Sequence, residues 1–433
     1  MEPPCRIVPK TAGDVLSAVR HLIAANTTFA VASGGHSSNA GASNVEGGVT
    51  IDLASLNEVT LVEDETAVWL GPGARWQDVY SALEPYNLVV SGGRVAHVGV
   101  GGYVLGGGFS WFSNEFGWTC DSVLAFEVVT PAGSLLPVDK VSHAELFWAL
   151  KGTLGAFGIV TRMEMPTIRN DAVFGGGISY GEPQLPAAFS ALQELASNAE
   201  EHLAIQGYLS FGYSSEYQHW GHTVYLIDTA PYGNHNASIT TFRDIPHVYD
   251  SLRNTTIGDS AREIADSNPL GFSRAKFTLT TNCSAETMRL MYDIIRRDTL
   301  DLESDQDLFI GATFQPLTVP HLNRQDNALN LGSEGSALLL VSFEFWWEDA
   351  SLESHYQSRA RSLHKRLRSS LVESRALHRF VYPNYAAEWQ NPFGDLAPSS
   401  QARLERVKSI YDPDDIWRAL RPGIWHIAGR TSL

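Results

Sequence analysis

The sequence reads Ser91-Gly-Gly-Arg-Val-Ala-His-Val-Gly-Val-Gly-Gly102 and then, after three intervening residues, Gly106-Gly-Gly108. Glycine loses more conformational freedom on folding than other residues and supplies no side chain to bury, so turns alone do not explain this density. Close approach of the backbone to a large, flat ligand explains the density of glycine residues. We therefore predict ligand contacts from Gly92, Gly93, Gly99, Gly101, Gly102, Gly106, Gly107 and Gly108. A flexible, glycine-rich lid is the alternative.

Two further glycine-rich loops lie before and after this stretch. Ser33-Gly34-Gly35-His36-Ser37 follows a predicted strand at residues 29–32, and its glycines let N–H groups turn toward a pyrophosphate. The next residues read as a loop, so the dinucleotide fingerprint that opens a helix is not reproduced. The later loop leads into a strand that would bring Gly158, Ile159 and Val160 alongside the same ligand. Three loops fit one extended cofactor, although the first taken alone also fits a structural turn with a surface histidine.

The charge balance argues against two classes of partner. The chain has 31 basic and 48 acidic residues, a formal net charge of −17, which repels phosphate backbones and anionic lipid surfaces. We expect neither nucleic acid nor membrane as a partner. The apolar runs, such as residues 337–341, are far shorter than the roughly 20 residues of a membrane span. We expect a soluble protein, and its first five residues show no secretory signal pattern.

The cysteines and glycosylation sequons leave the cellular compartment open. The three cysteines are Cys5, Cys120 and Cys283, which allow at most one internal disulfide and no multi-cysteine metal site, so we expect no metal. Cys120 reads as a small buried residue. N-x-S/T sequons occur at Asn26, Asn236, Asn254 and Asn282. They are compatible with passage through a secretory pathway and equally with chance.

The order of predicted elements divides the chain into three parts. Up to about residue 168, short strands alternate with helices and glycine turns, which is an α+β pattern. In residues 169–375 alternating runs predict a larger antiparallel sheet, with helices at about 186–199, 285–299 and 352–373 over one face. Residues 376–433 read as a return to the first part. We therefore predict a cofactor domain at 1–168, a substrate domain at 169–375 and a closing segment at 376–433.

Further motifs give these loops a family likeness. They include Gly47-Gly-Val-Thr-Ile-Asp-Leu53, Gly117-Trp-Thr-Cys-Asp121, Leu146-Phe-Trp-Ala-Leu-Lys-Gly152 and Tyr411-Asp-Pro-Asp414. Together the motifs resemble the berberine-bridge-enzyme-like branch of the vanillyl-alcohol-oxidase (PCMH-type) flavoproteins, most closely its fungal FAD-linked oxidoreductases. The resemblance implies a PCMH-type FAD-binding domain of two α+β subdomains. It also implies a substrate domain whose antiparallel sheet, covered by helices, roofs the isoalloxazine ring.

The resemblance implies a covalent cofactor. His36 stands in the position of the histidine that is joined through its ring to the flavin 8α-methyl carbon. Such a bond raises the reduction potential of the flavin and favours removal of hydride from an unactivated carbon. Some relatives add a second bond through a cysteine, but Val95 or Ala96 stands there in this chain, so we expect a single attachment. Val98 stands where the family's residue beside the flavin controls access of oxygen, and a small valine is compatible with oxidase activity.

The proton acceptor is predicted from the segment Tyr382-Pro-Asn384-Tyr385, which resembles the family's strand presenting a catalytic tyrosine. We predict Tyr382 and Tyr385 as catalytic residues and Asn384 as a cofactor contact. Packing in the core is the alternative for either tyrosine. Phe109 stands where some relatives have a second tyrosine and cannot accept a proton. His97, Tyr103 and Glu388 are further candidates, with a structural role as the alternative for each.

The resulting hypothesis is an FAD-dependent oxidoreductase, more specifically an oxidase. It would remove hydride from a small organic substrate, a secondary metabolite, with molecular oxygen as acceptor. The site would lie between the two domains. Four aromatic residues are candidates for an apolar pocket, with packing in the core as the alternative: Trp111, Phe314, Trp346 and Trp389. One alternative is a flavoprotein that directs an oxidative or non-redox cyclisation, including a pericyclic one. Another is a flavin-binding protein without turnover.

Overall fold

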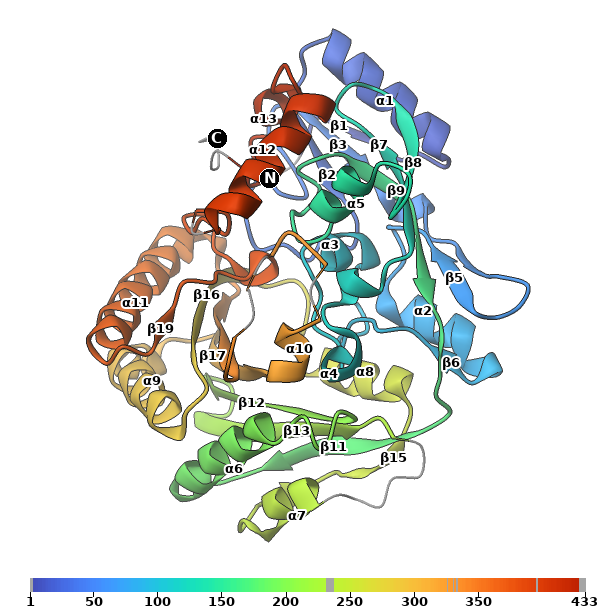
Figure 1. Ribbon diagram of the computed structural model, residues 1–433. Coiled ribbons are helices and arrows are strands. Elements are labelled where there is room, and N and C mark those ends of the chain that lie inside the picture. The colour runs from blue at the N-terminus through green and yellow to red at the C-terminus, as the bar shows by residue number, and fades with distance from the viewer. Residues whose placement is uncertain are drawn as a thin grey trace.

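The computed structural model describes residues 3–230, 237–324, 326–329, 331, 334–394 and 396–427. The fold is α+β, as predicted. Sheets of three, five and two strands are built from residues 5–169, and a nine-stranded antiparallel sheet is built from residues 173–378 (Figure 1).

The first sheet is parallel, in the order β1 (Cys5–Ile7), β3 (Val49–Asp52), β2 (Phe29–Ala32). Helix α1 (Ala12–Ala24) packs against it through Val15 and Val19. A capping box starts the helix, because the Thr11 side chain accepts from the Asp14 N–H while the Asp14 carboxylate accepts from the Thr11 N–H. This sheet positions the loop that follows β2.

The second sheet is antiparallel, and the third glycine-rich loop leads into its central strand, β9 (Ile159–Pro166). Its order is β4 (Val59–Leu61), β5 (Ala67–Leu70), β9, β7 (Ala125–Val129), β8 (Leu135–Asp139). A two-stranded sheet pairs β10 (Ile168–Arg169) with β6 (Leu88–Val89). The helices of this region are α2 (Trp76–Leu83), α3 (Val100–Leu105), α4 (Ser113–Phe116) and α5 (Ala144–Leu150).

The nine-stranded sheet is large enough to form one wall of a site. Its order is β14 (Tyr249–Asp250), β11 (Val173–Ser179), β13 (His219–Asp228), β12 (Ile205–Ser214), β17 (Leu308–Leu317), β18 (Leu338–Trp347), β16 (Ser273–Asn282), β19 (Leu377–His378), and β15 (Arg253–Thr255) also pairs with β11. The predicted helices are present as α6 (Leu185–Ser197), α9 (Ala285–Asp298) and α11 (Glu353–Glu373), and they pack on one face. Helix α7 (Ala237–Asp244) lies beside α6 (Figure 1).

The two faces of this sheet differ in polarity because side chains alternate along each strand. The helix-covered face presents buried aromatic residues such as Phe211, Phe277 and Phe343. The opposite face carries a row of hydroxyl side chains that are neighbours across the strands: Thr278, Ser342, Thr313, Ser210 and Thr223. The polar face is turned toward the glycine-rich loops.

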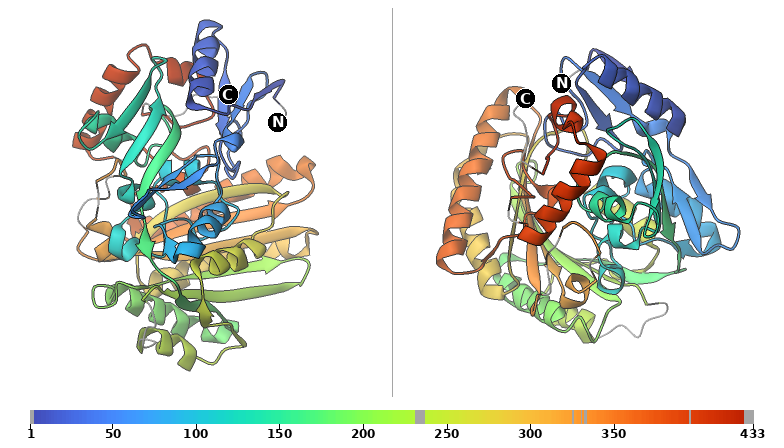
Figure 2. Two further views of the ribbon diagram at one scale, coloured as in Figure 1. Left: turned by 90° about the vertical axis from the view of Figure 1, so that its right-hand side faces the viewer. Right: turned by 45° about the horizontal axis from the view of Figure 1, so that its top comes forward.

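The end of the chain returns to the first sheet. Helices α12 (Pro398–Tyr411) and α13 (Ile416–Leu420) lie beside the N-terminal elements in both views of Figure 2. The Trp417 ring meets the Phe29 ring edge-on, with 5.4 Å between their centroids. Both residues belong to the same core as α1.

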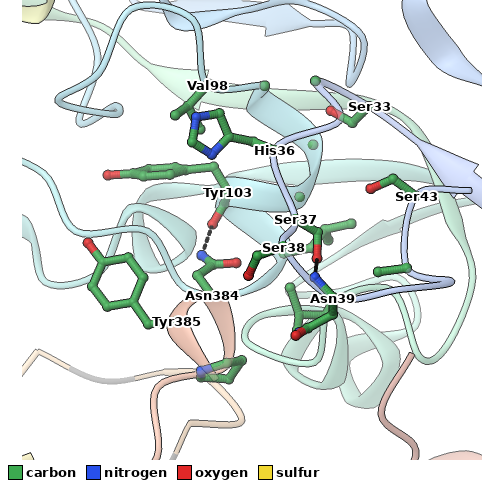
Figure 3. Close-up of a pocket in the computed structure, with 18 of the residues that line it drawn as sticks. Ser33, His36, Ser37, Ser38, Asn39, Ser43, Val98, Tyr103, Asn384 and Tyr385 are labelled. Atoms are coloured by element: carbon green, nitrogen blue, oxygen red, sulfur yellow. Dashed lines mark hydrogen bonds between the residues drawn. The ribbon is translucent and has the colours of Figure 1, made fainter. Parts of the chain in front are cut away.

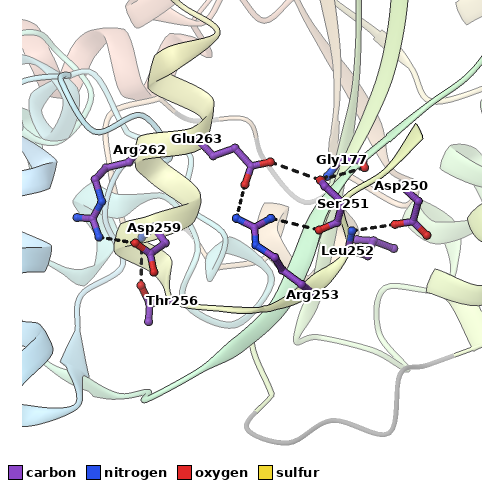
Figure 4. Close-up of polar contacts among 9 residues, drawn as sticks. All are labelled: Gly177, Asp250, Ser251, Leu252, Arg253, Thr256, Asp259, Arg262 and Glu263. Atoms are coloured by element: carbon purple, nitrogen blue, oxygen red, sulfur yellow. Dashed lines mark hydrogen bonds and ion pairs between the residues drawn. The ribbon is translucent and has the colours of Figure 1, made fainter. Parts of the chain in front are cut away.

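Helix α8 (Ile257–Asp266) is fixed between the nine-stranded sheet and α2 by the polar network in Figure 4. The Thr256 hydroxyl caps its N-terminus by accepting from the Asp259 N–H. The Glu263 carboxylate accepts from Arg253 at 2.7 Å and from the Ser251 hydroxyl at 3.4 Å. The network orients α8 so that Ile264 reaches the cavity described below.

Within the described ranges, no helix has both the length and the apolar composition needed to cross a membrane. Cys120 is fully buried with a free thiol, as predicted. The sequon residues Asn26, Asn254 and Asn282 are exposed, whereas Asn236 lies outside the described residues.

Candidate functional site

A cavity of about 340 Å³ lies between the glycine-rich loops and the polar face of the nine-stranded sheet (Figure 3). This volume falls within the range typical of small-molecule sites. The residues predicted to bind a cofactor that line it are Ser33, Gly34, Gly35, His36, Ser37, Val98, Gly99, Gly101, Gly102, Gly158, Ile159, Val160 and Asn384. All three glycine-rich loops therefore meet at one cavity, as the sequence indicates.

The first two loops are held in contact by backbone packing. A Cβ atom on Gly34 would lie 2.5 Å from the Gly99 nitrogen, which only a missing side chain permits. Arg75 joins the same two segments, because its guanidinium donates to the Gly34 and His97 carbonyl oxygens. The Ser33 hydroxyl donates to the Pro72 carbonyl oxygen at 2.5 Å. The loops thus form a preformed cradle.

His36 lies in this cradle with its ring accessible from the cavity (Figure 3). Its ring stacks on that of His97, with 5.1 Å between centroids. Desolvation by the surrounding protein lowers the pKa of His36 to about 3, and the charges of Lys276, His97 and Arg274 act in the same direction. The imidazole is therefore neutral at physiological pH, so one ring nitrogen has a lone pair available for bonding.

The cavity has unfilled space next to the cradle. A Cβ atom on Gly35 or on Gly102 would meet no atom within 4 Å, so both glycines face open room on the cavity wall. Arg421 also lines the cavity, and its Nε atom is buried without a hydrogen-bond partner in the described part of the chain. Backbone N–H groups, an unpaired cationic nitrogen and a neutral histidine suit an extended ligand that contains a pyrophosphate. The residues present therefore fit FAD.

Five predicted glycine contacts are explained by packing inside the protein, and these glycines do not line the cavity. Cβ atoms on Gly92 and Gly93 would lie 2.5 Å and 2.3 Å from the Trp76 ring. The other three would collide with side chains of the same core: Gly106 with Asn384, Gly107 with Leu329 and Gly108 with Thr119. These five glycines permit close packing beneath the cradle, because a side chain at any of them would collide with a neighbouring side chain of the protein.

The structure separates the two predicted catalytic tyrosines. Tyr385 lines the cavity, and its hydroxyl donates to Gln315 Oε1 at 3.4 Å. Tyr382 is 1 % exposed, does not line the cavity, and accepts from the Gly108 N–H at 2.9 Å. Burial raises the pKa of Tyr382 well above its usual value. The Asn384 amide donates to both the Tyr103 carbonyl oxygen and the Tyr382 hydroxyl. These two bonds fix the turn between Tyr382 and Tyr385.

The further candidates for a proton acceptor are engaged elsewhere. His97 Nε2 contacts the Asn268 carbonyl oxygen at 2.9 Å. The Tyr103 hydroxyl donates to the Phe109 carbonyl oxygen, and burial raises the pKa of Tyr103. Glu388 pairs with Arg361. Of all the predicted candidates, Tyr385 has the hydroxyl best placed toward the cavity.

The wall opposite the cradle is polar, and the four aromatic candidates lie outside the cavity, as their alternative interpretation as core residues predicts. Trp111, Phe314, Trp346 and Trp389 do not line the cavity. Phe314, for example, is on the helix-covered face and fully buried. The lining side chains that the prediction missed are Arg94, Tyr208, Ser210, Arg274, Lys276, Thr313, Gln315, Ser342 and Glu344. Polar residues alternating with aromatic ones in β16, β17 and β18 were the signal that could have found most of them.

Comparison with known proteins places this geometry in a family. A model described as "FAD binding domain" matches residues 3–139, which include the first two glycine-rich loops. The "FAD-dependent monooxygenase tpcD" of Cochliobolus heterostrophus is 33 % identical over 98 % of this chain and 84 % of its own length. The "FAD-dependent monooxygenase sdcF" of Emericella nidulans is 31 % identical over 98 % of this chain and 90 % of its own.

The chain belongs to the same family of FAD-linked oxidoreductases as these fungal proteins. Solved structures show the same fold for this flavoprotein. The 6-hydroxy-D-nicotine oxidase of Arthrobacter nicotinovorans superposes with a TM-score of 0.81 at 20 % identity, covering 98 % of this chain and 92 % of that one. A berberine-bridge-enzyme-like protein (#28) of Arabidopsis thaliana gives a TM-score of 0.79 at 15 % identity, with 98 % and 92 % covered.

Membership of this family establishes the general chemistry. The protein is an FAD-dependent oxidoreductase, and its full-length relatives are fungal enzymes named as monooxygenases. The matched FAD binding domain includes the first two loops of the glycine cradle. The bound cofactor supplies a group that accepts two electrons as hydride.

Proposed function

We propose that this flavoprotein is an oxidase of small organic secondary metabolites, with FAD attached covalently to His36 and molecular oxygen as electron acceptor. One observation carries the proposal: a single cavity joins the glycine cradle, the neutral ring of His36 and the phenol of Tyr385. A bond from the histidine ring would hold the cofactor in the cradle and raise its reduction potential, which favours oxidation of unactivated C–H bonds. Val95 and Ala96 offer no second point of attachment.

Tyr385 is the proposed proton acceptor. In the phenolate form its oxygen Oη would take the proton from a substrate hydroxyl or N–H group, while hydride would leave the adjacent carbon for the bound cofactor. Gln315 holds Oη through the contact at 3.4 Å, and the Lys276 ammonium lies 4.2 Å from the centre of the Tyr385 ring. These contacts orient the phenol toward the space between the sheet and the cradle. Tyr382 would instead support the loop at Gly108 from below.

Access of oxygen is proposed to pass Val98. This side chain lies on the cavity wall next to Gly99, in the loop that packs on Gly34. A valine leaves more room beside a flat ligand than a longer side chain would. We propose that this room admits oxygen to the reduced cofactor.

Insertion of an oxygen atom is a second candidate, which the names of the relatives favour. Cyclisation of the substrate is a third outcome of the same scaffold. Product mass separates the three: oxidation removes two hydrogens, monooxygenation adds one oxygen atom, and a non-redox cyclisation leaves the mass unchanged. Labelled oxygen gas would identify the source of any added atom.

A substrate screen tests the proposal. The purified holoprotein is mixed without oxygen with a panel of alcohols, phenols and amines while the flavin absorbance is followed. We expect at least one class to bleach the flavin, and air should then restore the colour and release hydrogen peroxide. A panel that never bleaches the flavin, with FAD fully bound, would favour a binding protein without turnover. Restoration of the colour without peroxide and with labelled oxygen in the product would instead support monooxygenation.

A further inference from the structure

The sheet side of the cavity carries more positive than negative charge. Three cations line it, Arg94, Arg274 and Lys276, together with the carboxylate of Glu344. Glu344 pairs with Arg274, since Oε2 lies 3.7 Å from Nη1. Across the described ranges, neither Arg94 nor Lys276 has a carboxylate within 4.0 Å. The chain as a whole has a net charge of −17, so this local excess runs against the overall balance.

Arg94 is buried without an anion. Its side chain is 9 % exposed and lies among the rings of Phe109, Trp111 and Tyr208, whose centroids are 4.5, 5.3 and 4.9 Å from Cζ. The rings stabilise a cation through their faces but offer no strong hydrogen-bond acceptor. Its one hydrogen bond within the described residues goes from Nη2 to Gln315 Oε1. A buried cation with so few acceptors is costly unless a ligand supplies the missing ones.

Lys276 lines the same part of the cavity as Arg94, next to Tyr385. It is on β16, and its cross-strand neighbour Glu344 is already engaged by Arg274. The Lys276 ammonium instead lies over the Tyr385 ring at 4.2 Å. Gln315 Oε1 accepts from both Arg94 and Tyr385. The two cations are therefore linked through Gln315 and Tyr385, beside the proposed proton acceptor.

We propose that Arg94 and Lys276 form a subsite for an anionic oxygen group of the substrate, such as a carboxylate. The proposal rests on the proposed function, because the ligand is taken to be the molecule that is oxidised. An acidic substrate would complete the hydrogen bonding of Arg94 and neutralise Lys276. It would also be placed with its reacting carbon next to Tyr385. Substrate selection would then depend on charge more than on apolar fit, in keeping with the polar lining of the sheet.

The pyrophosphate of the cofactor does not explain these two cations. The cradle consists of backbone at residues 33–37 and 98–102, whereas Arg94 and Lys276 contact side chains of β12, β17 and the turn at Tyr385. The flavin ring is the other group that could use a positive charge, because reduction makes it more negative. The experiment must therefore separate an effect on ligand affinity from an effect on the cofactor.

Ligand titrations of the oxidised holoprotein test the subsite without turnover. Benzoate and its neutral isostere benzamide are added separately while the visible flavin spectrum is recorded. We expect benzoate to bind at least about tenfold more tightly than benzamide. Lys276→Met should remove that preference while leaving benzamide affinity unchanged. The matched control Lys365→Met, an exposed lysine on α11, should behave as the wild type. Arg94→Lys, which keeps the charge but changes the donor geometry, should retain part of the preference.

The outcomes distinguish the subsite from the proposed function. Equal binding of the two probes by the wild type, or no binding of benzoate by flavin-loaded protein, would overturn the subsite. So would a Lys276→Met variant that keeps the benzoate preference. If that variant instead shifts the flavin reduction potential and leaves benzoate affinity intact, the cation acts on the cofactor and the subsite is again rejected. Failure of the proposed function would be seen separately, as flavin that no substrate reduces even though benzoate still binds.

Discussion

Replacing Gly34 with alanine tests the packing that builds the cofactor cradle. A Cβ atom there would lie 2.5 Å from the Gly99 nitrogen and 2.6 Å from the Gly99 Cα. Ordinary contacts begin at 3.4 Å, so the two loops must separate by about 0.9 Å (3.4 − 2.5). Both loops resist this movement because Arg75 donates to carbonyl oxygens on each. Overpacking of this kind costs about 1–3 kcal/mol of stability.

The assay compares flavin content, from the ratio of visible to ultraviolet absorbance, with the midpoint of thermal unfolding. We expect Gly34→Ala to lose flavin and to melt at a lower temperature, because His36 is only two residues away and moves with the loop. Gly221→Ala is the matched control, since its Cβ atom on β13 would meet no atom within 4 Å. The packing argument is refuted if Gly34→Ala carries as much flavin as the control and melts at the same temperature.

Three further predictions concern the tyrosines, acid stability and oxygen. Tyr385→Phe should lower kcat roughly 10²- to 10⁴-fold with a substrate found in the screen. Tyr382→Phe should instead lower stability by about 1–3 kcal/mol, because the buried Gly108 N–H loses its acceptor; a kcat loss as large in Tyr382→Phe without loss of stability would contradict this division. Burial lowers the pKa of His321 to about 3, so the unfolded chain binds a proton below pH 6.5 that the folded protein does not. The buried neutral His321 therefore does not reduce the free energy of unfolding above pH 6.5, but it reduces it by roughly 1.4 kcal/mol per pH unit on acidification toward pH 3. His321→Leu should flatten the fall in melting temperature over this range. An unchanged dependence of the melting temperature on pH would argue against this role of His321. Val98→Leu should slow reoxidation of the photoreduced protein about tenfold, a barrier increase of about 1.4 kcal/mol, and equal stopped-flow rates would remove Val98 from the oxygen path.

Local signals were sufficient to predict much of the fold. Thr11 and Asp14 mark the start of α1 because they form a capping box, a contact between residues three apart. The strand at Phe29–Ala32 and the loop at Gly34–His36 were likewise predictable from adjacent residues. The meeting of three glycine-rich loops at one cavity followed from their number and composition. The family likeness supplied the cofactor.

Long-range packing decided what the sequence could not show. Gly92 and Gly93 resemble cradle glycines, yet they are required by the Trp76 ring, some 16 residues earlier in the chain. Alternation in β16 predicts two faces but not which one the helices cover, so the polar wall around Lys276 was missed. Tyr382 and Tyr385 are separated by a single turn that sends one into the core and the other to the cavity. Such assignments depend on the tertiary structure.

The central claim is the bond between His36 and the flavin, and mass mapping of acid-precipitated protein tests it most directly. Trypsin should release residues 21–75 as one peptide, since no Lys or Arg occurs between Arg20 and Arg75. We predict that the pellet stays yellow and that this peptide carries one flavin mass, located by fragmentation at His36 and not at His21. An unmodified peptide, with all FAD free in the supernatant, would contradict the claim.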